Sequence, residues 1–418
     1  MLGLSSEAGY QITHSADDAE IIVVNTCGFI EDAKQESIDT ILEAAQYKDK
    51  KCQKLIVAGC LSERYPEQLK KEIPEIDVLC GTQAFSEITK FFPAENKSSI
   101  EKTNTRLKDY DLPRINTQAF FRAYLKLAEG CAKRCSFCVI PSIRGPLRSR
   151  NQSSLVKEAM TLAQGGVKEL SLIAQDLTDY GRDRKDESSL QGLLQNLQQI
   201  KGLDWIRLFY MYPDQLEDKM LHFIADNPKI CRYLDLPLQH INNQILSNMN
   251  RKIDSKKIYN MIEKLKSHMP DIVLRTSLMV GFPGETEENF KELCDFVEQG
   301  HIDHLGVFTY SHEEGSPSYK KFEDNISLDT KLARQKELLA LQSAQLSKNF
   351  ASRWQDKKVS VLIEDKVKEN LYFGRHYGQA HEVDNKCLIE SDKELTLGEF
   401  VDGSIDSLKD ADHVVSLY

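Results

Sequence analysis

Three closely spaced cysteines, Cys131, Cys135 and Cys138, constrain this chain more than any other feature of its sequence. Their C-x3-C-x2-C spacing places three thiols on one short loop (the cysteine loop, residues 131–138), directly after the apolar run at residues 123–128. Thiolates hold iron–sulfur clusters, and a four-iron cluster usually takes four, so three local ligands leave one iron open to a small molecule. Zinc is the main alternative, but no second pair of Cys or His follows at zinc-site spacing. Three unrelated core cysteines would rarely lie this close together.

Length and composition narrow the class of protein. A chain of 418 residues with 41% hydrophobic and 28% charged residues indicates a soluble globular protein of two or three domains. No apolar run approaches the roughly 18 residues of a membrane span, and the N-terminus has no signal-peptide pattern, so we expect no membrane partner. Ten cysteines in so long a chain favour reduced thiols and a cytoplasmic location.

The first 94 residues predict a small parallel α/β domain. Strand-like runs at 21–24, 55–58 and 77–80 alternate with helical stretches, and such alternation indicates a parallel sheet. Cys27 and Cys60 follow the first two strands, at the sheet edge where ligands collect. Because cysteines outside disulfides are often buried, a purely structural role is about equally expected for each of them.

A (β/α) barrel is predicted to follow. Six strand-like runs, each followed by a helical stretch, indicate a partial barrel of six units rather than eight. They begin at Arg122, Glu169, Trp205, Tyr233, Ile272 and His304. The cysteine loop follows the first strand, Gln175 and Asp176 follow the second, and Arg275 lies on the fifth. Barrels of this kind carry their chemistry at the carboxyl ends of the strands, although a cap or turn role is the alternative for each polar residue. A charged amphipathic helix is expected over 322–350.

The last segment, 353–418, predicts a small all-β barrel of the oligonucleotide-binding type, with short strands at 359–363, 380–383 and 386–390. From Trp354 to the end it carries fourteen Asp and Glu against eight Lys and Arg, a formal balance of −6. An RNA-binding groove needs positive charge along the phosphate backbone. Since the whole chain also has a net charge of −10, direct nucleic-acid binding is not expected as its main role, and a basic protein is the better partner.

The cysteine spacing, with Phe137 before the last cysteine, resembles the signature of the radical S-adenosylmethionine (SAM) enzymes. Residues 25–30 (Asn-Thr-Cys-Gly-Phe-Ile) and 58–65 (Ala-Gly-Cys-Leu-Ser-Glu-Arg-Tyr) resemble the N-terminal domain of the methylthiotransferases within that family. The Gly-Phe-Ile and Leu-Ser-Glu-Arg-Tyr variants are similar to the branch that acts on ribosomal small-subunit protein twelve. The resemblance implies four segments: an N-terminal methylthiotransferase domain at 1–94, a linker at 95–118, a radical SAM barrel at 119–352, and a TRAM-like β-barrel at 353–418.

The resemblance also implies two four-iron, four-sulfur clusters and SAM as cofactors. One cluster would be held by Cys131, Cys135 and Cys138, with its open iron binding SAM. The second would be held by three cysteines of the N-terminal domain, two of which match Cys27 and Cys60. The cofactor contacts implied on this chain are Phe137, Gln175, Asp176 and Arg275.

The first cysteine of the second cluster has no counterpart in the chain. Met1 opens on a segment that resembles the end of the helix that should follow this cysteine, and neither Cys52 nor Cys80 has the expected context. We therefore expect the coding sequence to begin upstream of Met1 and to supply a strand and a cysteine-bearing loop. A stop codon directly before Met1 would instead leave the second cluster in doubt.

The implied reaction adds a methylthio group to the β-carbon of an aspartate in ribosomal small-subunit protein twelve, with an electron-donor protein as a further partner. One SAM donates the methyl group, and another yields the radical that abstracts hydrogen from an unactivated carbon, a step that only a cofactor can perform. Two alternatives share most of these features. One is a tRNA methylthiotransferase, which the acidic C-terminal segment disfavours. The other is a non-catalytic iron–sulfur protein that binds the ribosome or RNA and would not cleave SAM.

Overall fold

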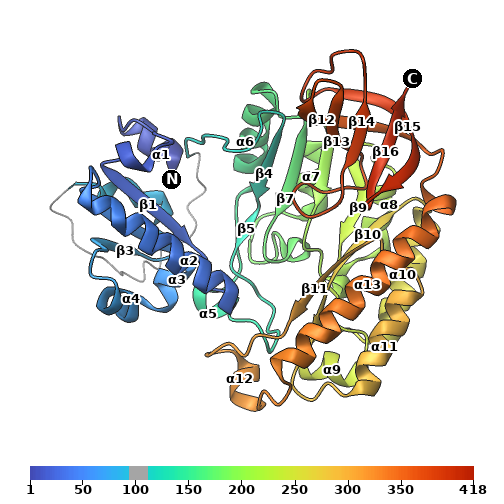
Figure 1. The fold of residues 1–418 in the computed structure, drawn as a ribbon, viewed down its shortest axis with the longest axis horizontal. Coiled ribbons are helices and arrows are strands. Elements are labelled where there is room, and N and C mark those ends of the chain that lie inside the picture. Colours follow the sequence, from blue (N-terminus) through green and yellow to red (C-terminus); the bar gives the residue numbers. More distant parts are fainter. Residues whose placement is uncertain (94–111) are drawn as a thin grey trace. The chain divides into compact units, whose positions relative to one another are not determined.

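The computed structural model describes residues 1–93 and 112–418 (Figure 1). Its described residues form two compact units. The first comprises Met1–Thr117, Glu129–Ser154 and Ser311–Lys320, and the second comprises Gln118–Ala128, Leu155–Tyr310 and Lys321–Tyr418. The linker predicted at 95–118 lies mostly outside the described residues, and its described part, 112–118, contains no helix or strand. None of the helices in the described ranges combines the length and apolarity needed to cross a membrane.

The first unit is built on a three-stranded parallel sheet in the order β1-β2-β3, which confirms the three predicted strands. Its strands are β1 (Ile21–Thr26), β2 (Lys54–Gly59) and β3 (Val78–Cys80). The central strand β2 is buried along almost its whole length, and apolar clusters pack on both of its faces. Because both faces are covered, β2 reads in the sequence as a continuous apolar run.

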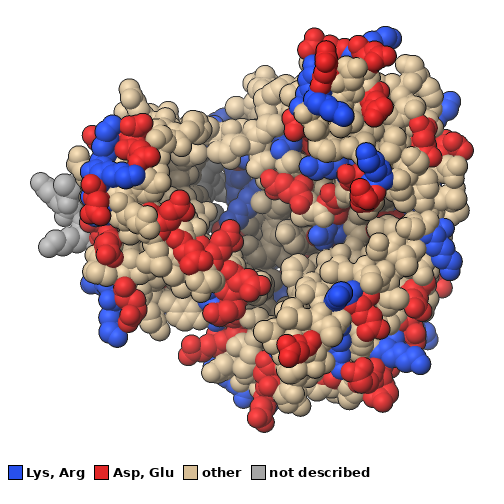
Figure 2. Space-filling view, viewed as in Figure 1, with Lys and Arg blue, Asp and Glu red and all other residues tan. Residues whose placement is uncertain are grey.

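The helices of the first unit include the two helical stretches predicted after its first two strands. They are α1 (Leu2–Glu7), α2 (Glu31–Ala45), α3 (Cys60–Arg64), α4 (Pro66–Glu72), α5 (Ile140–Arg144) and α12 (Pro317–Lys321), with 3-10 turns at Ala16–Asp18, Gln46–Asp49 and Ala84–Phe91. Helix α4 begins with Pro66 at a position where a missing N–H costs nothing. Acidic side chains line the exposed face of α2 (Figure 2), namely Glu31, Asp32, Glu36, Asp39 and Glu43.

The second unit contains six parallel strands in the order β11-β10-β9-β8-β7-β4. They are β4 (Arg122–Lys126), β7 (Glu169–Ile173), β8 (Trp205–Leu208), β9 (Ile230–Asp235), β10 (Val273–Val280) and β11 (His304–Thr309). The predicted strand–helix barrel is therefore confirmed. The largest difference in a strand's start is at β9, which begins at Ile230 and not at Tyr233.

Seven helices connect or follow these strands. They are α6 (Gln152–Gln164), α7 (Leu190–Leu197), α8 (Asp218–Ala225), α9 (Asn243–Asn248), α10 (Ser255–His268), α11 (Glu287–Glu298) and α13 (Leu328–Arg353), with 3-10 turns at Leu177–Asp179 and Pro213–Gln215. Helix α13 corresponds to the charged helix predicted over 322–350, but it begins six residues later, after the capping side chain of Ser327. Two short strands, β5 (Ala128–Glu129) and β6 (Arg148–Ser149), pair with each other on either side of the cysteine loop.

A closed five-stranded barrel ends the chain, as predicted. Its strands are β12 (Lys358–Lys368), β13 (Leu371–Arg375), β14 (Cys387–Glu390), β15 (Phe400–Lys409) and β16 (Asp412–Leu417). The strand predicted at 380–383 was wrong, because this segment is a turn. Its backbone reverses at Glu382, which has a positive φ of 68°, and the carboxylate of Asp384 accepts a hydrogen bond from Ala380 N (2.8 Å).

The six-stranded sheet and the C-terminal barrel share one apolar core. Trp205, Tyr233 and Val273 from the sheet pack in the same buried cluster as Trp354 and Val361. Charged side chains are buried beside this core. Glu169 on β7 pairs with Arg207 (2.7 Å) and with Arg375, and Arg375 also pairs with Glu364 (2.7 Å). The sheet and the barrel are therefore parts of one folded body.

Candidate active site

The cysteine loop lies in the first unit and follows β4 and β5 in the chain. Its three cysteines are reduced thiols with intermediate exposure. Backbone N–H groups donate to two of the sulfurs, from Lys133 to Cys131 Sγ (3.3 Å) and from Ile140 to Cys138 Sγ (3.4 Å). Cys138 N donates to Cys135 O (3.2 Å), which closes a turn between these two cysteines. The two hydrogen bonds to sulfur are of the type that sets the reduction potential of a bound iron–sulfur cluster.

This set of donors fits a four-iron cluster. Three soft thiol ligands stand on one partly exposed loop, and the loop continues directly into helix α5, which fixes its far end. In such a cluster each thiolate binds a different iron, so the ligands lie farther apart than those of a single ion. Across residues 1–93 and 112–418, no three His, Cys, Asp or Glu side chains are close enough to hold one metal ion.

Cys27 and Cys60 lie at the same edge of the three-stranded sheet. Thr26 and Gly59, the last residues of β1 and β2, are opposite each other in the parallel register, so the two cysteines follow on neighbouring loops. Cys27 is exposed, and its N–H donates to Ser37 Oγ (3.0 Å) on α2. Cys60 is buried as the first residue of α3. The structure therefore brings together the two residues predicted as ligands in this domain.

The other two cysteines of this domain have core positions. Cys80 ends β3 and is fully buried beside Ile56 and Ala58. Burial raises the pKa of its thiol to about 12, as expected for a side chain in an apolar core. Cys52 is also buried, and burial raises the pKa of its thiol as well.

Arg144, at the end of helix α5, links the segment after the cysteine loop to Cys60. Its Nη2 lies 3.1 Å from Cys60 Sγ, and its Nη1 lies 2.8 Å from Oε1 of the buried Glu129. Burial would lower the pKa of Arg144, but the carboxylate of Glu129 outweighs this effect and raises it, so the guanidinium stays charged. Burial raises the pKa of the Cys60 thiol, and the charge of Arg144 opposes this shift.

The segment Ser311–Lys320 is anchored near both sets of cysteines. Its buried Glu313 accepts from Arg64 Nη1 (2.7 Å) and Lys34 Nζ (3.2 Å). The same Nη1 of Arg64 donates to the carbonyl of Gly28 (2.9 Å), the residue after Cys27. At the other end of the segment, Ser318 N donates to Ser136 O (2.8 Å) within the cysteine loop.

The second unit offers a polar site on one face of its sheet, which we call the inner face. Side chains on this face contact the C-terminal barrel: Tyr124, Arg207, Tyr233, Arg275 and His304. Side chains alternate between the two faces of a strand, so Asp235, Ser277 and Phe308 also lie on the inner face, nearer the carboxyl ends of their strands. A Cβ at Gly306 would lie 3.5 Å from the Phe308 ring and 3.6 Å from Arg275 Nη2, which places these groups together.

Gln175 and Asp176 follow β7, as predicted. The Oε1 atom of Gln175 is buried and has no hydrogen-bond partner, so it is able to accept a hydrogen bond from a bound molecule. Asp176 caps the following 3-10 turn, because its Oδ1 accepts from Thr178 N (2.8 Å) and Thr178 Oγ1 (2.6 Å). An unsatisfied polar atom of the kind found at Gln175 fits a polar cofactor at the strand ends.

Arg275 lies between two carboxylates. Its Nη1 is 3.7 Å from Asp235 Oδ1 and its Nε is 3.4 Å from Asp384 Oδ1. Asp235 is buried, and its Oδ2 accepts a hydrogen bond from Tyr210 N (3.1 Å). Burial raises the pKa of Asp235 to about 6, although Arg275 opposes this shift. A buried carboxylate with a strongly raised pKa, next to a guanidinium, is typical of functional sites.

Two residues at this end of the sheet have strained backbones. Tyr210, after β8, has a φ of 56°, and Gln239, after β9, has a φ of 75°. Such left-handed conformations cost of order 1–2 kcal/mol for residues with a side chain, and they gather at functional sites. The Tyr210 and Phe308 side chains are each 48% exposed, so two aromatic rings are available to a ligand.

A pocket of about 360 Å³ lies between the loops that follow β7 and β8. Its lining includes Tyr180, Arg182, Met211 and Gln215, and Oε1 of Gln215 is buried without a hydrogen-bond partner. This volume is within the range of small-molecule sites, and the position, at the carboxyl ends of two barrel strands, is where such folds bind ligands.

Sequence reasoning missed several residues of these sites. Arg144 and Glu313 touch the cysteine-bearing loops, and Asp384 reaches the inner face from the C-terminal barrel. Only Arg144 had a signal, because it lies in the Pro-Ser-Ile-Arg-Gly stretch just after the cysteine loop. Glu313 and Asp384 act across more than 100 positions of sequence, and no local pattern marks such a pairing.

Family models match three parts of the chain. The Radical SAM superfamily matches residues 125–297, the uncharacterized protein family UPF0004 matches residues 1–81, and the TRAM domain matches residues 357–416. A six-stranded parallel barrel that carries a three-cysteine loop after its first strand is the architecture of a radical SAM enzyme. The class of protein is therefore the radical SAM enzymes.

Curated relatives are similar over nearly the full length. The ribosomal protein uS12 methylthiotransferase RimO of Acetivibrio thermocellus is 42% identical over 99% of this chain and 93% of its own. Those of Geotalea uraniireducens and Alkaliphilus oremlandii are 46% and 43% identical, over 94% and 100% of this chain and 88% and 95% of their own. The chain belongs to the RimO family of radical SAM methylthiotransferases.

Solved structures show the same fold. The radical SAM methyltransferase TsrM of Kitasatospora setae, with cobalamin and a [4Fe-4S] cluster bound, aligns with a TM-score of 0.55 and 15% identity. The alignment covers 72% of this chain and 66% of that one. Membership of the radical SAM superfamily implies a 4Fe-4S cluster and SAM as cofactors, and the UPF0004 match favours a second cluster.

Proposed function

We propose that this chain inserts a methylthio group at the β-carbon of an aspartate in ribosomal protein uS12. The observation that carries the proposal is the cysteine loop, with its three reduced, partly exposed thiols directly after the first barrel strand. The names of the relatives supply the substrate. A saturated carbon of this kind has no acid–base route to substitution, so the hard step belongs to a cofactor.

The proposed roles follow from the positions of the residues. Cys131, Cys135 and Cys138 would hold a four-iron cluster, which would supply the electron that cleaves SAM. Backbone donors from Lys133 and Ile140 stabilise two of these thiolates. Phe137, Gln175, Asp176 and Arg275 are the proposed cofactor contacts. Of these, Gln175 has the clearest support, because its buried Oε1 lacks a partner.

Cys27 and Cys60 are the proposed ligands of a second cluster, where the inserted sulfur would be held. Their support is the shared edge of the sheet on which they lie and the hydrogen bond of Arg144 to Cys60. The proposed domain boundaries are 1–94 and 119–352 for the two cluster-bearing domains, with 95–118 between them, and 353–418 for the TRAM-like barrel.

We place the reaction in the cytoplasm, with an electron-donor protein as a second partner besides uS12. The support for a protein substrate over tRNA is electrostatic. The C-terminal barrel carries a balance of −6, whereas nucleic-acid grooves need an excess of Lys and Arg along the phosphate path.

The test is anaerobic reconstitution followed by mass analysis of uS12 after incubation with SAM and a chemical reductant. We expect uS12 to gain the mass of one methylthio group in place of one hydrogen, located on an aspartate. The Cys135→Ala variant should neither form deoxyadenosine nor modify uS12. Cys294→Ala is the matched control, since this buried cysteine of α11 lies outside the site and should leave both activities intact.

Total tRNA is incubated in parallel as the competing substrate. If a tRNA nucleoside gains the methylthio mass while uS12 does not, the chain is a tRNA methylthiotransferase. If neither is modified and no deoxyadenosine forms, although a cluster is present, the chain is a non-catalytic iron–sulfur protein.

A further inference from the structure

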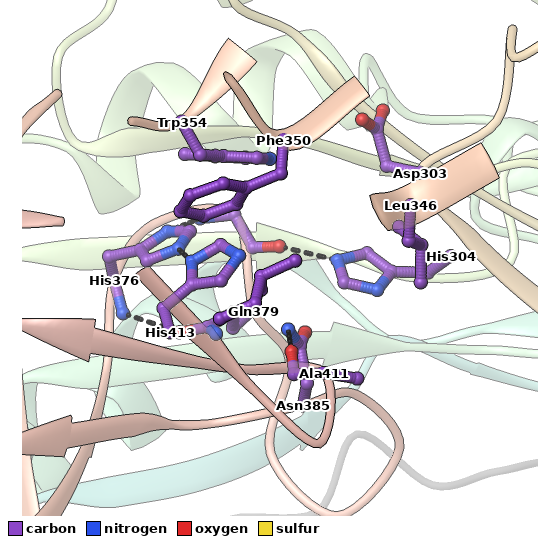
Figure 3. A pocket seen from close by; sticks show the side chains of 12 residues that line it. Asp303, His304, Leu346, Phe350, Trp354, His376, Gln379, Asn385, Ala411 and His413 are labelled. Carbon is purple, nitrogen blue, oxygen red and sulfur yellow. Dashed lines mark hydrogen bonds between the residues drawn. The ribbon is translucent and has the colours of Figure 1, made fainter. Parts of the chain in front are cut away.

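One loop of the C-terminal barrel contacts all six strands of the parallel sheet. This loop, residues 375–384, connects β13 to β14. On the first three strands, Glu382 contacts Tyr124 on β4 (3.4 Å), Arg375 contacts Glu169 on β7, and the Tyr377 carbonyl contacts Arg207 on β8 (2.7 Å). Asp384 contacts Tyr233 on β9 (2.8 Å) and Arg275 on β10 (3.4 Å). The Gly378 carbonyl contacts His304 on β11 (2.8 Å; Figure 3). The loop therefore covers the inner face at its amino-terminal end.

The packing around this loop leaves little space. Figure 3 shows the cavity beside His304, which is enclosed by His376, His413 and Trp354 and by helix α13. Its volume is about 20 Å³, which is room for about one water molecule. His376 and His413 hydrogen-bond each other at 2.9 Å across it. Since there is so little free volume, the loop has a fixed position against the sheet.

Asp384 is the charged group that this loop brings to the inner face. Its side chain is only 1% exposed. One oxygen, Oδ2, accepts from Tyr233 Oη (2.8 Å) and from Ala380 N (2.8 Å), which fixes the direction of the carboxylate. The other oxygen, Oδ1, has no hydrogen bond and lies 3.4 Å from Arg275 Nε and 3.5 Å from His304 Nδ1.

Two carboxylates approach the Arg275 guanidinium at different atoms. Asp384 approaches it at Nε, and Asp235 approaches it at Nη1 (3.7 Å). Nη2 and Nη1 lie 3.6 and 3.8 Å from the place that a Cβ would take at Gly306, which has no side chain to fill this space. A planar guanidinium presents its donors in a rigid fork, so a partner that fixes one edge also aims the remaining N–H groups.

We propose that Asp384 is a positioning residue that the C-terminal barrel supplies to the active site, where it orients Arg275 for its contact with SAM. The inference rests on the proposed role of Arg275 as a cofactor contact. The C-terminal barrel would then contribute to cofactor binding as well as to any docking of substrate, because its loop covers the amino-terminal end of the inner face. Binding of SAM then depends on a residue more than 100 positions away from Arg275 in the sequence.

The experiment compares Asp384→Asn, Arg275→Gln and the double variant in the full-length, cluster-loaded protein. The asparagine keeps the size of the side chain and an acceptor for Tyr233 and Ala380, but it removes the charge that faces Arg275. Asp412→Asn is the matched control, since Asp412 is another carboxylate of the C-terminal barrel that accepts a backbone hydrogen bond, from Lys386 N to its Oδ1 (2.7 Å). The readouts are equilibrium binding of SAM, the KM and kcat of deoxyadenosine formation, and thermal unfolding.

We expect Asp384→Asn to weaken SAM binding about tenfold, equivalent to about 1.4 kcal/mol. The KM should rise with little change in kcat, and the loss of thermal stability should be no larger than in Asp412→Asn. The double variant should bind SAM as Arg275→Gln does, because a positioning residue has no effect once its target is gone.

Three outcomes would overturn the proposal. The first is that SAM binding is unchanged in Asp384→Asn while Arg275→Gln weakens it. The second is that the effects of the two substitutions on SAM binding add in the double variant. Either result would mean that Asp384 acts through stability alone. The third is unchanged SAM binding in Arg275→Gln, which would remove Arg275 as a cofactor contact. That last result would leave the proposed methylthiotransferase activity standing, since the modification of uS12 by the wild-type protein is measured separately.

Discussion

The buried carboxylate of Asp235 lowers the stability of the folded protein when it is ionised. It is 3% exposed, and burial raises its pKa to about 6 from the ordinary value near 4. Arg275 and the N–H of Tyr210 stabilise the charged form, but at 3.7 Å the guanidinium does not compensate for the loss of water. Natural proteins keep such groups where function needs them, which is a reason to place Asp235 in the site.

We expect Asp235→Asn to be more stable than the wild type above pH 6. The native carboxyl keeps its proton up to about pH 6, whereas the unfolded one loses it near pH 4, so the wild type loses stability as the pH rises between these values. A shift of about two pKa units corresponds to at most about 3 kcal/mol. Asparagine does not titrate, and its Oδ1 still accepts from Tyr210 N. The measurement is thermal unfolding of the cluster-free protein at pH 4.5 and pH 8.

The stability gap between Asp235→Asn and the wild type should widen as the pH rises from 4.5 to 8. Asp218→Asn serves as the control, because the hydrogen bond from Lys264 lowers the pKa of the exposed Asp218, so its gap should not widen as the pH rises. A gap for Asp235→Asn that is constant or narrows toward pH 8 would show that the carboxyl is already ionised in the folded protein at low pH.

At the level of elements, the segment Ser311–Lys320 depends on one buried carboxylate. Glu313 is 3% exposed and pairs with Arg64 and Lys34. Burial would raise the pKa of Glu313, but hydrogen bonds from Ser311 and Arg64 and the charge of Lys34 lower it, so the group is ionised at neutral pH. Removing this charge would leave the largely buried Arg64 guanidinium without its carboxylate, a destabilising change, whereas Lys34 would keep its pair with Glu31 (2.5 Å).

We expect Glu313→Gln to loosen this segment without unfolding the chain. Amide hydrogen exchange in residues 311–320 should accelerate by about tenfold or more, because the segment opens locally once its anchor is weakened. Its neighbour Glu314 is exposed, so Glu314→Gln is the matched control and should exchange as the wild type does. Equal exchange in both variants would show that the backbone contacts, such as Ser318 with Ser136, hold the segment on their own.

Elements with a strong local pattern could be predicted from the sequence, and long-range pairs could not. Buried strands such as β2 and β7 are apolar runs, and Cys27 and Cys60 fall at strand ends, so the sheets and the cysteine-bearing loops were predicted correctly. The segment 380–383 was predicted as a strand because Ala-His-Glu-Val alternates, yet a tertiary contact of Asp384 makes it a turn. Strands β13, β15 and β16 were not predicted, since their consecutive apolar residues number at most three in β13 and two in β15 and β16.

At the level of the whole molecule, the C-terminal barrel completes the core of the sheet. The sheet buries Trp205, Tyr233 and Val273 against the barrel, and Arg207 and Glu169 are buried with them. We expect a chain truncated after Arg353 to be insoluble or to bind a hydrophobic dye strongly, because these apolar and charged groups would face water. The measurement is the soluble fraction and dye binding, with the full-length chain as reference. A soluble truncated chain with a cooperative unfolding transition would contradict a shared core.

The charge of the whole molecule bears on its substrate. The chain has a net charge of −10, the C-terminal barrel has −6, and acidic side chains line α2 (Figure 2). A basic ribosomal protein would be attracted to such a surface, and salt would screen that attraction.

We therefore expect the KM for uS12 to rise about fivefold or more between 50 and 300 mM NaCl, with kcat unchanged, because charged rims act on encounter rather than on chemistry. Deoxyadenosine formation without uS12 should not change over this range and is the control for effects of salt on the cofactors. Added tRNA should not compete with uS12 at either salt concentration, since the C-terminal barrel lacks the excess of basic residues that a phosphate backbone requires. A KM that does not depend on salt, together with inhibition by tRNA, would mean that a local basic face controls recognition despite the negative total.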